Sequence, residues 1–307
     1  MKGLEISKRY YEEYGREMIA GEFPGYEGRI AVGLAGPGSD CFGFDDEIST
    51  DHDSGAGFCM WLTDSDYEEI GFSLSRAYSR LPDEIDGIKR GDAPLFGSGH
   101  FGAMKISDFF LPLTGTSGAP ETRDQWLFTP DYSLAAAVNG EVFRDDLGIF
   151  SGIRQKIMRD MPMDVRLKKI SARVIGMAQS GQYNFPRCIS HGETGAASLA
   201  LAEFVKETAM LVYLLNGRYA PFYKWMLRGM KDLPIFPELS GELETLITRE
   251  TSAESAGVIE DICRRVGRYL CEIGLTTSQS DFLEPYAYEI RDKIKDSRIR
   301  NMHIMEG

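Results

Sequence analysis

The chain has 307 residues, of which 43% are hydrophobic and 26% are charged, an ordinary composition for a soluble globular protein. At roughly 100–200 residues per domain, this length predicts two domains. The formal net charge of −13 disfavours a nucleic-acid binder, because such proteins usually present a basic surface to the phosphates.

The first half of the chain alternates between helical and strand patterns. Apolar residues at helical spacing predict helices, and short apolar runs bounded by glycine predict buried strands. The helices are expected at residues 4–20, 65–80 and 122–138, and the strands at residues 30–35, 58–62, 103–106 and 141–143.

From about residue 149 onward strand-like runs nearly vanish and helical patterns take over. Loops containing glycine and proline separate the helices. The helices are expected at residues 153–158, 165–180, 196–215, 222–231, 239–247, 253–273 and 281–295. The sequence therefore predicts an α+β protein with an N-terminal α/β domain over residues 1–150 and an all-α domain over residues 151–307.

The cysteines and the apolar runs predict the cellular compartment of the protein. The five cysteines are scattered and form no CxxC pair, which argues against a disulfide framework or a zinc ribbon and favours a reducing compartment. No signal peptide is evident, and no apolar stretch has the length needed to span a bilayer. We therefore expect a cytoplasmic protein without a membrane partner.

The clearest chemical signal follows the first predicted strand, where Gly38 and Ser39 precede Asp51 and Asp53. A Gly-Ser turn exposes backbone N–H groups that cradle phosphate oxygens, and the serine hydroxyl adds a donor. If Asp51 and Asp53 lie in an extended segment, their carboxylates share one face. Mg²⁺ takes one or two such carboxylates together with substrate phosphates, and two ions can clamp a phosphoryl or nucleotidyl displacement.

This pattern resembles a known superfamily. Gly-Ser followed after about ten residues by Asp-x-Asp is the hallmark of polymerase-beta-like nucleotidyltransferases, and here eleven residues (40–50) separate the two parts. The whole string of residues 38–53, with the blocks 139–145, 181–187 and 215–225, looks like a bacterial group called domain of unknown function 4037. The resemblance covers most of the chain. It implies a nucleotidyltransferase-type mixed sheet with flanking helices and then a helical bundle, but no particular substrate.

A third carboxylate would distinguish an enzyme from a binding module. Reactive members of the superfamily usually carry this acid on a later strand. Here the strand expected at residues 103–106 contains Lys105, and Asp108 follows directly as the candidate catalytic acid. Without a third acid that converges on the site, the same fold would bind a nucleotide without transferring it.

Two polar and aromatic blocks in the second half offer further candidates. Residues 182–187 include Arg187 and residues 216–225 include Lys224. Aromatic side chains with Arg or Lys can stack a base or hold phosphates, but they are equally typical of a helix–helix junction. If they are functional, Arg187 and Lys224 should bind nucleotide at the cleft between the domains.

Together these residues predict a Mg²⁺-dependent nucleotidyltransferase that moves a nucleoside monophosphate from a nucleoside triphosphate to an unknown acceptor. Gly38 and Ser39 would hold the β- and γ-phosphates, and the helical domain would supply the pocket for a small molecule or a protein side chain. The alternative is a non-catalytic nucleotide-binding or protein-interaction module on the same fold. An RNA-modifying transferase would need a basic surface, which the net charge disfavours.

Overall fold

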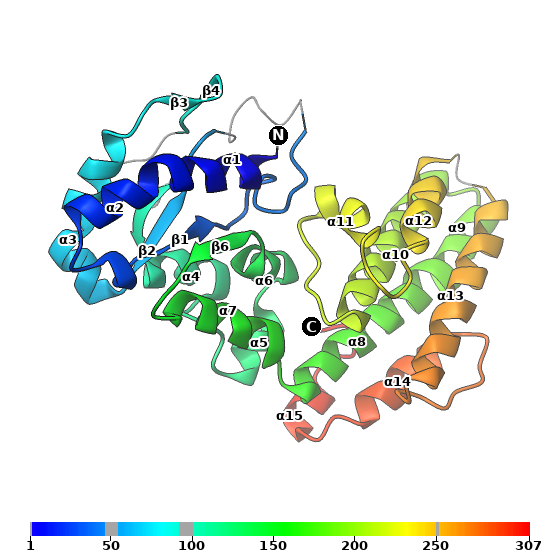
Figure 1. Ribbon diagram of the computed structural model, residues 1–307. Helices are drawn as coiled ribbons and strands as arrows, with labels where there is room; N and C mark the ends of the chain where they lie inside the picture. Colours follow the sequence, from blue (N-terminus) through cyan, green and yellow to red (C-terminus); the bar gives the residue numbers. More distant parts are fainter. Residues whose placement is uncertain (1, 47–54, 92–100, 250–251) are drawn as a thin grey trace. The chain divides into compact units, whose positions relative to one another are not determined.

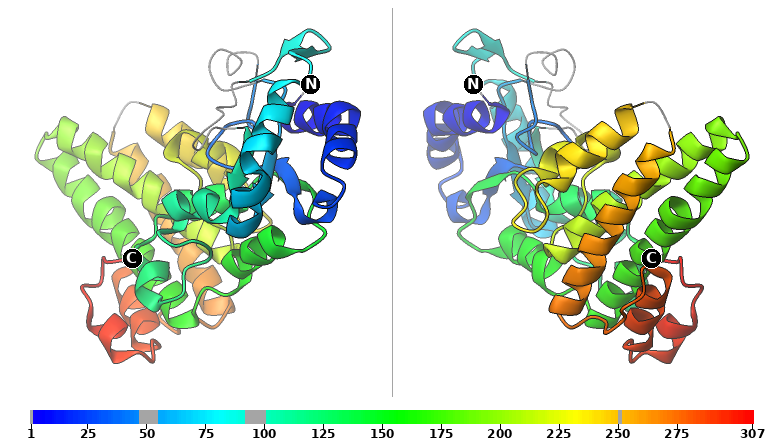
Figure 2. Two further views of the ribbon diagram at one scale, coloured as in Figure 1. Left: turned by 90° about the vertical axis from the view of Figure 1, so that its left-hand side faces the viewer. Right: turned by 90° about the vertical axis from the view of Figure 1, so that its right-hand side faces the viewer.

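The computed structural model describes residues 2–46, 55–91, 101–249 and 252–307. The protein is α+β, as predicted, and divides into two compact units (Figures 1 and 2). The sheet unit comprises Met1–Gln125 and Thr129–Asp160, and the helical unit comprises Trp126–Phe128 and Met161–Gly307. The division falls about ten residues beyond the boundary expected from the sequence, because α7 (Ile149–Arg159) packs into the sheet unit.

The sheet unit is built on a four-stranded mixed sheet. Its strands are β1 (Ala31–Leu34), β2 (Cys59–Leu62), β5 (Gly102–Lys105) and β6 (Glu141–Arg144), in the order β5-β2-β1-β6. Strand β1 is antiparallel to both β2 and β6, whereas β2 and β5 are parallel. Every residue of β1 and β2 is buried, which explains why both read as continuous apolar runs. A separate hairpin joins β3 (Glu84–Ile85) and β4 (Ile88–Lys89).

Helices cover both faces of this sheet. The ring of Phe58, just before β2, contacts the rings of Tyr11 and Tyr78, whose centroids lie 5.4 Å and 5.0 Å away. Trp61 stacks at 3.9 Å on Phe150 of α7. Because successive side chains of a strand point to opposite faces, Phe58 and Trp61 mark two separate layers of core. The helices of this unit are α1 (Gly3–Tyr10), the π-helical turn η1 (Tyr11–Gly15), α2 (Arg16–Glu22), the 3-10 turn η2 (Glu27–Arg29), α3 (Asp64–Ser79), α4 (Ile106–Thr114), α5 (Arg123–Phe128, shared with the helical unit), α6 (Asp131–Val138) and α7.

The helical unit is organised around a long antiparallel pair. The segments α8 (Met163–Met177), η4 (Ala178–Asn184, a π-helix) and α9 (Phe185–Ser190) follow one another without a break, and α10 (Thr194–Leu215) packs along them. The remaining helices are α11 (Tyr223–Met230), α12 (Leu239–Thr248), α13 (Glu254–Glu272), α14 (Glu284–Asp292) and α15 (Ser297–Asn301). Among the described residues, no helix is both long and apolar enough to cross a membrane.

Candidate functional site

Gly38 and Ser39 lie in the turn by which the chain leaves β1, hereafter the Gly-Ser turn (residues 36–39). The turn begins at Gly36, whose φ of +132° suits glycine because a Cβ would be strained there. Beyond the turn, the N–H of Phe44 donates to the carbonyl of Ser39 at 2.9 Å. Residues 39–46 contain turns and no helix, so any phosphate bound here would meet the amides of a loop.

The turn lies at the end of the sheet where the chain later enters β2. In the antiparallel β1–β2 pair, Gly33 faces Cys59, so the exit of β1 and the entry to β2 share one end of the sheet. Asp51 and Asp53 belong to the connection between the two strands, and both lie outside the described residues. In the sequence, Asp53 precedes the first described residue of the β2 lead-in, Gly55, by two positions.

Asp108 lies at the opposite end of the sheet. Strand β5 is parallel to β2 and pairs Lys105 with Leu62, so it ends where β2 ends. Asp108 is an exposed residue in the first turn of α4, just beyond Lys105. Its neighbour Ser107 donates a hydrogen bond to Asp64, the first residue of α3, at 2.6 Å. The structure therefore does not bring Asp108 to the Gly-Ser turn.

Asn139 holds this turn, a role that the sequence did not reveal although the residue belongs to the block 139–145. Its side-chain Nδ2 donates to the carbonyl of Gly36 at 2.6 Å, and its Oδ1 accepts the N–H of Gly36 at 3.0 Å. One amide thereby satisfies both backbone groups of a residue that has left the β-ladder, where unpaired backbone groups would otherwise be costly. The Asn139-Gly140 dipeptide is a recognised turn signal and could have drawn attention to this position.

Gly140 allows Asn139 to come this close. Its φ is +69°, and a Cβ placed there would lie 2.0 Å from the carbonyl oxygen of Leu34 and 2.9 Å from the Cα of Ala35. No side chain fits in that space. The end of α6 is thus packed directly on the exit of β1.

Arg154 of α7 holds the end of α6 from the other side. Its Nη2 donates to the carbonyl of Val138 at 2.9 Å and also to the carbonyl of Asn139. The side chain is 7% exposed, and no ion pair joins it to a carboxylate among the residues that the structure describes. Its Nη1 is buried and has no hydrogen-bond partner among the described residues, and the guanidinium carbon lies 5.6 Å from the centroid of the Phe150 ring. Burial lowers the pKa of Arg154 to about 10, so the guanidinium still carries its charge at neutral pH.

Two buried thiols lie beneath the same turn. Burial raises the pKa of the Cys41 thiol well above its usual range, with a further contribution from neighbouring Asp40, and the thiol contacts the backbone of Gly38. Burial likewise raises the pKa of Cys59 to about 12. Because the thiolate is the nucleophilic form, neither cysteine is suited to nucleophilic catalysis at neutral pH.

Residues 126–226 match the family model of domain of unknown function 4037. The resemblance stated from the sequence is confirmed over these residues. The matched region includes Asn139 and Arg154 but not the Gly-Ser turn or Asp51 and Asp53. Comparison with curated proteins gives no match.

Among solved structures, the chain is similar to a nucleotidyltransferase-like protein from Exiguobacterium sibiricum 255-15. The two share 12% sequence identity over 87% of this chain and 79% of that chain, with a TM-score of 0.35. A likeness at that TM-score carries no argument about function.

Arg187 and Lys224 both lie within the region matched to domain of unknown function 4037, but in different places. Arg187, on α9, is exposed and its guanidinium lies 5.2 Å from the ring centroid of Tyr183. Lys224, on α11, is exposed with its Nζ 4.4 Å from the ring centroid of Trp225. Helix α9 leads into the start of α10, whereas α11 follows its end (Figure 1). Tyr213, near the C-terminal end of α10, donates a hydrogen bond to the carbonyl of Met226 of α11 at 2.9 Å, whereas α9 packs on α10 next to the turn that opens it. Helices α9 and α11 therefore lie beside opposite ends of a 22-residue helix.

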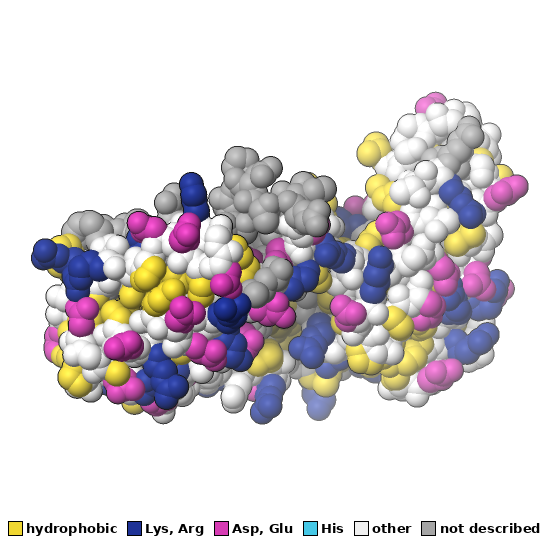
Figure 3. All heavy atoms as spheres, turned by 45° about the horizontal axis from the view of Figure 1, so that its top comes forward, with side chains coloured by type: hydrophobic (Ala, Val, Ile, Leu, Met, Phe, Trp, Pro, Cys, Tyr) yellow, Lys and Arg dark blue, Asp and Glu magenta, His cyan; other side chains and the backbone are white. Residues whose placement is uncertain are grey.

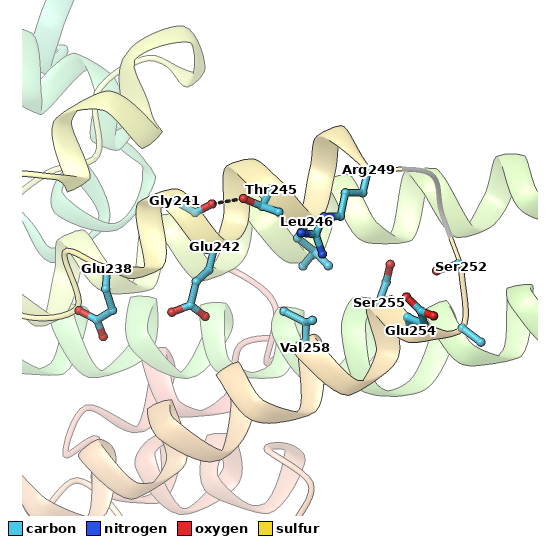
Figure 4. Close-up of a pocket in the computed structure, with 11 residues that line it drawn as sticks. Glu238, Gly241, Glu242, Thr245, Leu246, Arg249, Ser252, Glu254, Ser255 and Val258 are labelled. Atoms are coloured by element: carbon cyan, nitrogen blue, oxygen red, sulfur yellow. Dashed lines mark hydrogen bonds between the residues drawn. The ribbon is translucent and has the colours of Figure 1, made fainter.

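The helical unit contains a hollow outside the family match, between α12 and α13 (Figure 4). Its volume is about 1300 Å³. The carboxylates of Glu238 and Glu242, which line it, both pair with Arg265, which also pairs with Asp261. One guanidinium is therefore shared by three carboxylates, so the cluster keeps a net negative charge. The lining residues are Glu238, Gly241, Glu242, Thr245, Leu246, Arg249, Ser252, Ala253, Glu254, Ser255 and Val258.

Neither a group of metal ligands in the described parts of the chain nor a basic band on the face drawn in Figure 3 points to a second site. No group of three or more His, Cys, Asp or Glu side chains there is arranged to hold a metal ion. On the face drawn in Figure 3, basic and acidic side chains are interspersed over the sheet unit at the left. That face lacks the extended basic band typical of nucleic-acid binding.

Proposed function

We propose that the sheet unit binds a nucleoside triphosphate with Mg²⁺ and transfers its nucleoside monophosphate to an acceptor. The observation that carries this proposal is the Gly-Ser turn, which leaves β1 at the end of the sheet where β2 begins. The sequence that joins these two points contains Asp51 and Asp53 at the spacing of a nucleotidyltransferase.

Each residue has a distinct role in this proposal. Backbone N–H groups at Gly38 and Ser39, with the serine hydroxyl, bind the β- and γ-phosphates. Asp51 and Asp53 would hold Mg²⁺, which neutralises phosphate charge. The oxygen of an acceptor hydroxyl bonds to the α-phosphorus while its proton passes to water, the bond from the α-phosphorus to the oxygen shared with the β-phosphorus breaks, and pyrophosphate leaves. The protein contributes mainly position and charge.

One observation favours a second candidate, a nucleotide-binding module without turnover. Asp108, the acid expected to complete a catalytic site, lies at the far end of the sheet from the Gly-Ser turn. Binding alone needs only the turn and the metal-binding pair. The two candidates therefore differ in the release of pyrophosphate and not in the affinity for triphosphate.

Pyrophosphate release tests transfer directly. The wild-type chain is incubated with Mg²⁺ and each of ATP, GTP, CTP and UTP, alone and with panels of hydroxyl- or amine-bearing small molecules and proteins. We expect release that depends on one class of acceptor and is lost in Asp51→Ala/Asp53→Ala. Asp108→Ala is the matched control and should retain the wild-type rate. Tight triphosphate binding with no release for any acceptor would favour the binding module.

A further inference from the structure

The groups behind the Gly-Ser turn form a connected chain of contacts. Arg154 donates to the carbonyl of Asn139, and the side chain of Asn139 holds Gly36. A residue of α7 thus reaches the exit of β1 through a single intermediate. Hydrogen bonds have preferred directions. A substitution of Arg154 that displaces Asn139 should therefore also displace Gly36.

Arg154 has a feature that its structural role does not explain. A guanidinium offers five N–H donors, yet the described acceptors are two carbonyls, both on Nη2. The buried Nη1 has none. A buried donor without a partner is costly, and more so when it is charged. Arginines are rarely buried without a paired carboxylate.

The guanidinium of Arg154 lies where its charge can act on a bound anion. The hydrogen bond from Arg154 to the carbonyl of Asn139, and the two between the Asn139 side chain and Gly36, place the guanidinium one residue away from the Gly-Ser turn. A positive charge in a low-dielectric interior acts more strongly on nearby anions than a solvated charge does. An apolar side chain of similar size would fill the site without that effect.

We propose that Arg154 and Asn139 are positioning residues for the phosphates of the bound triphosphate. Asn139 fixes the Gly-Ser turn through both backbone groups of Gly36, and Arg154 fixes Asn139 and supplies a buried positive charge behind the turn. The inference rests on the proposed function and adds to it two residues outside the Gly-Ser and Asp-x-Asp pattern.

The test compares affinities for nucleoside triphosphate and monophosphate with Mg²⁺ by calorimetry. In Arg154→Met, the affinity for triphosphate should fall at least tenfold while that for monophosphate changes less, because the lost charge acts on the phosphates. Arg154→Lys should recover part of the loss. In Asn139→Asp, an added carboxylate replaces the amide donor to Gly36, so a loss of at least tenfold is expected.

Arg166→Met is the matched control. Arg166 donates to the carbonyl of Leu214 at the end of α10 at 3.0 Å, so it makes a comparable bond to a helix end, but within the helical unit. Its substitution should leave both affinities unchanged. Thermal unfolding identifies any variant that does not fold. If Arg154→Met fails to fold, Arg154→Lys and Asn139→Ser, with smaller predicted losses of three- to tenfold, take its place.

The outcomes separate the two proposals. Folded Arg154→Met and Asn139→Asp chains that bind triphosphate as the wild type does would overturn this inference and leave the proposed function standing. Equal losses for triphosphate and monophosphate, with no recovery by lysine, would also overturn it, since that is the pattern of a general structural defect. A wild-type chain that binds no triphosphate would overturn the proposed function and this inference with it.

Discussion

Asn139 and Gly36 are 103 positions apart in the sequence, yet the side chain of Asn139 forms hydrogen bonds with both the carbonyl and the N–H of Gly36. The amide donates at 2.6 Å and accepts at 3.0 Å. This pair fixes the point at which the chain leaves β1 and enters the Gly-Ser turn. The conformation of the turn therefore depends on where α6 ends as well as on the glycines within it.

The close packing of Gly140 on β1 predicts a large effect of a single methyl group. Gly140→Ala combines left-handed strain with overlap on the carbonyl of Leu34, and should lower the free energy of unfolding by about 2–5 kcal/mol. Gly43→Ala is the control, because Gly43 has the same φ of +69° with nothing within 4 Å. It should cost only about 1–2 kcal/mol. Equal losses in urea unfolding would contradict the close contact.

The contacts of Gln182 predict a structural role for residues 182–187, which the sequence left open between nucleotide binding and a helix–helix junction. Its Oε1 accepts the N–H of Leu283 at 2.8 Å, and its Nε2 donates to Glu260 and to the carbonyl of Asp281 at 2.8 Å and 2.9 Å. Gln182→Leu should destabilise the helical unit by about 2–4 kcal/mol, because buried groups lose their partners. Its triphosphate affinity should stay unchanged.

Thermal unfolding and calorimetry check the two halves of that prediction. The control is Gln279→Leu, at an exposed position, which should leave the melting temperature within a degree or two of wild type. A folded Gln182→Leu chain with weakened nucleotide binding would instead give this block a functional role.

Glu207 predicts a pH dependence of stability in the helical unit. Burial raises its pKa to about 7, although Arg173 at 3.1 Å opposes the shift. A raised pKa in the folded state means that stability is fully present below the unfolded value and is lost as the pH rises through about 7. Between pH 5 and pH 8 the loss should be about 2–3 kcal/mol.

Glu207→Gln removes this titration. Its stability relative to wild type should therefore rise by the same amount between pH 5 and pH 8, as measured by urea unfolding at each pH. Glu244→Gln, at an exposed position on α12 that does not contribute to the pKa of Glu207, should produce no such change. A Glu207→Gln profile parallel to that of wild type would show that the carboxylate is ionised throughout this range.

Because Arg187 and Lys224 belong to helices that lie beside opposite ends of α10, one bound nucleotide cannot contact both. That helix has 22 residues and is about 33 Å long at 1.5 Å per residue. We therefore expect at most one of Arg187→Met and Lys224→Met to weaken triphosphate binding, as measured by calorimetry. Comparable losses in both variants, each with a normal melting temperature, would contradict this placement.

The sequence predicted the elements whose signal is local. The apolar runs at residues 30–35 and 58–62 became β1 and β2 because both strands are buried on both faces. It missed α4, which contains Pro112, a residue that normally argues against a helix interior. The helix expected at residues 122–138 is divided into α5 and α6, because Pro130 interrupts it.

Only part of the candidate site was predictable, because local sequence patterns do not report tertiary contacts. Gly38 and Ser39 follow a strand in the sequence and could be found from that pattern. The Asn139-Gly140 dipeptide marks a turn in the sequence but does not reveal its contact with Gly36. Arg154 is linked to the Gly-Ser turn only through tertiary contacts, so no spacing in the sequence reveals it. Asp108 was assigned from its closeness to the end of a predicted strand, but the direction of β5 places that end away from the Gly-Ser turn.

The most direct test is a calorimetric titration of nucleoside triphosphates into the wild-type chain with and without Mg²⁺, repeated on Asp51→Ala/Asp53→Ala and on Asp108→Ala. We predict Mg²⁺-dependent binding that disappears in the double variant and persists in Asp108→Ala. If no triphosphate binds to the wild type, or if the folded double variant binds as tightly as the wild type, the nucleotide site is not where we place it.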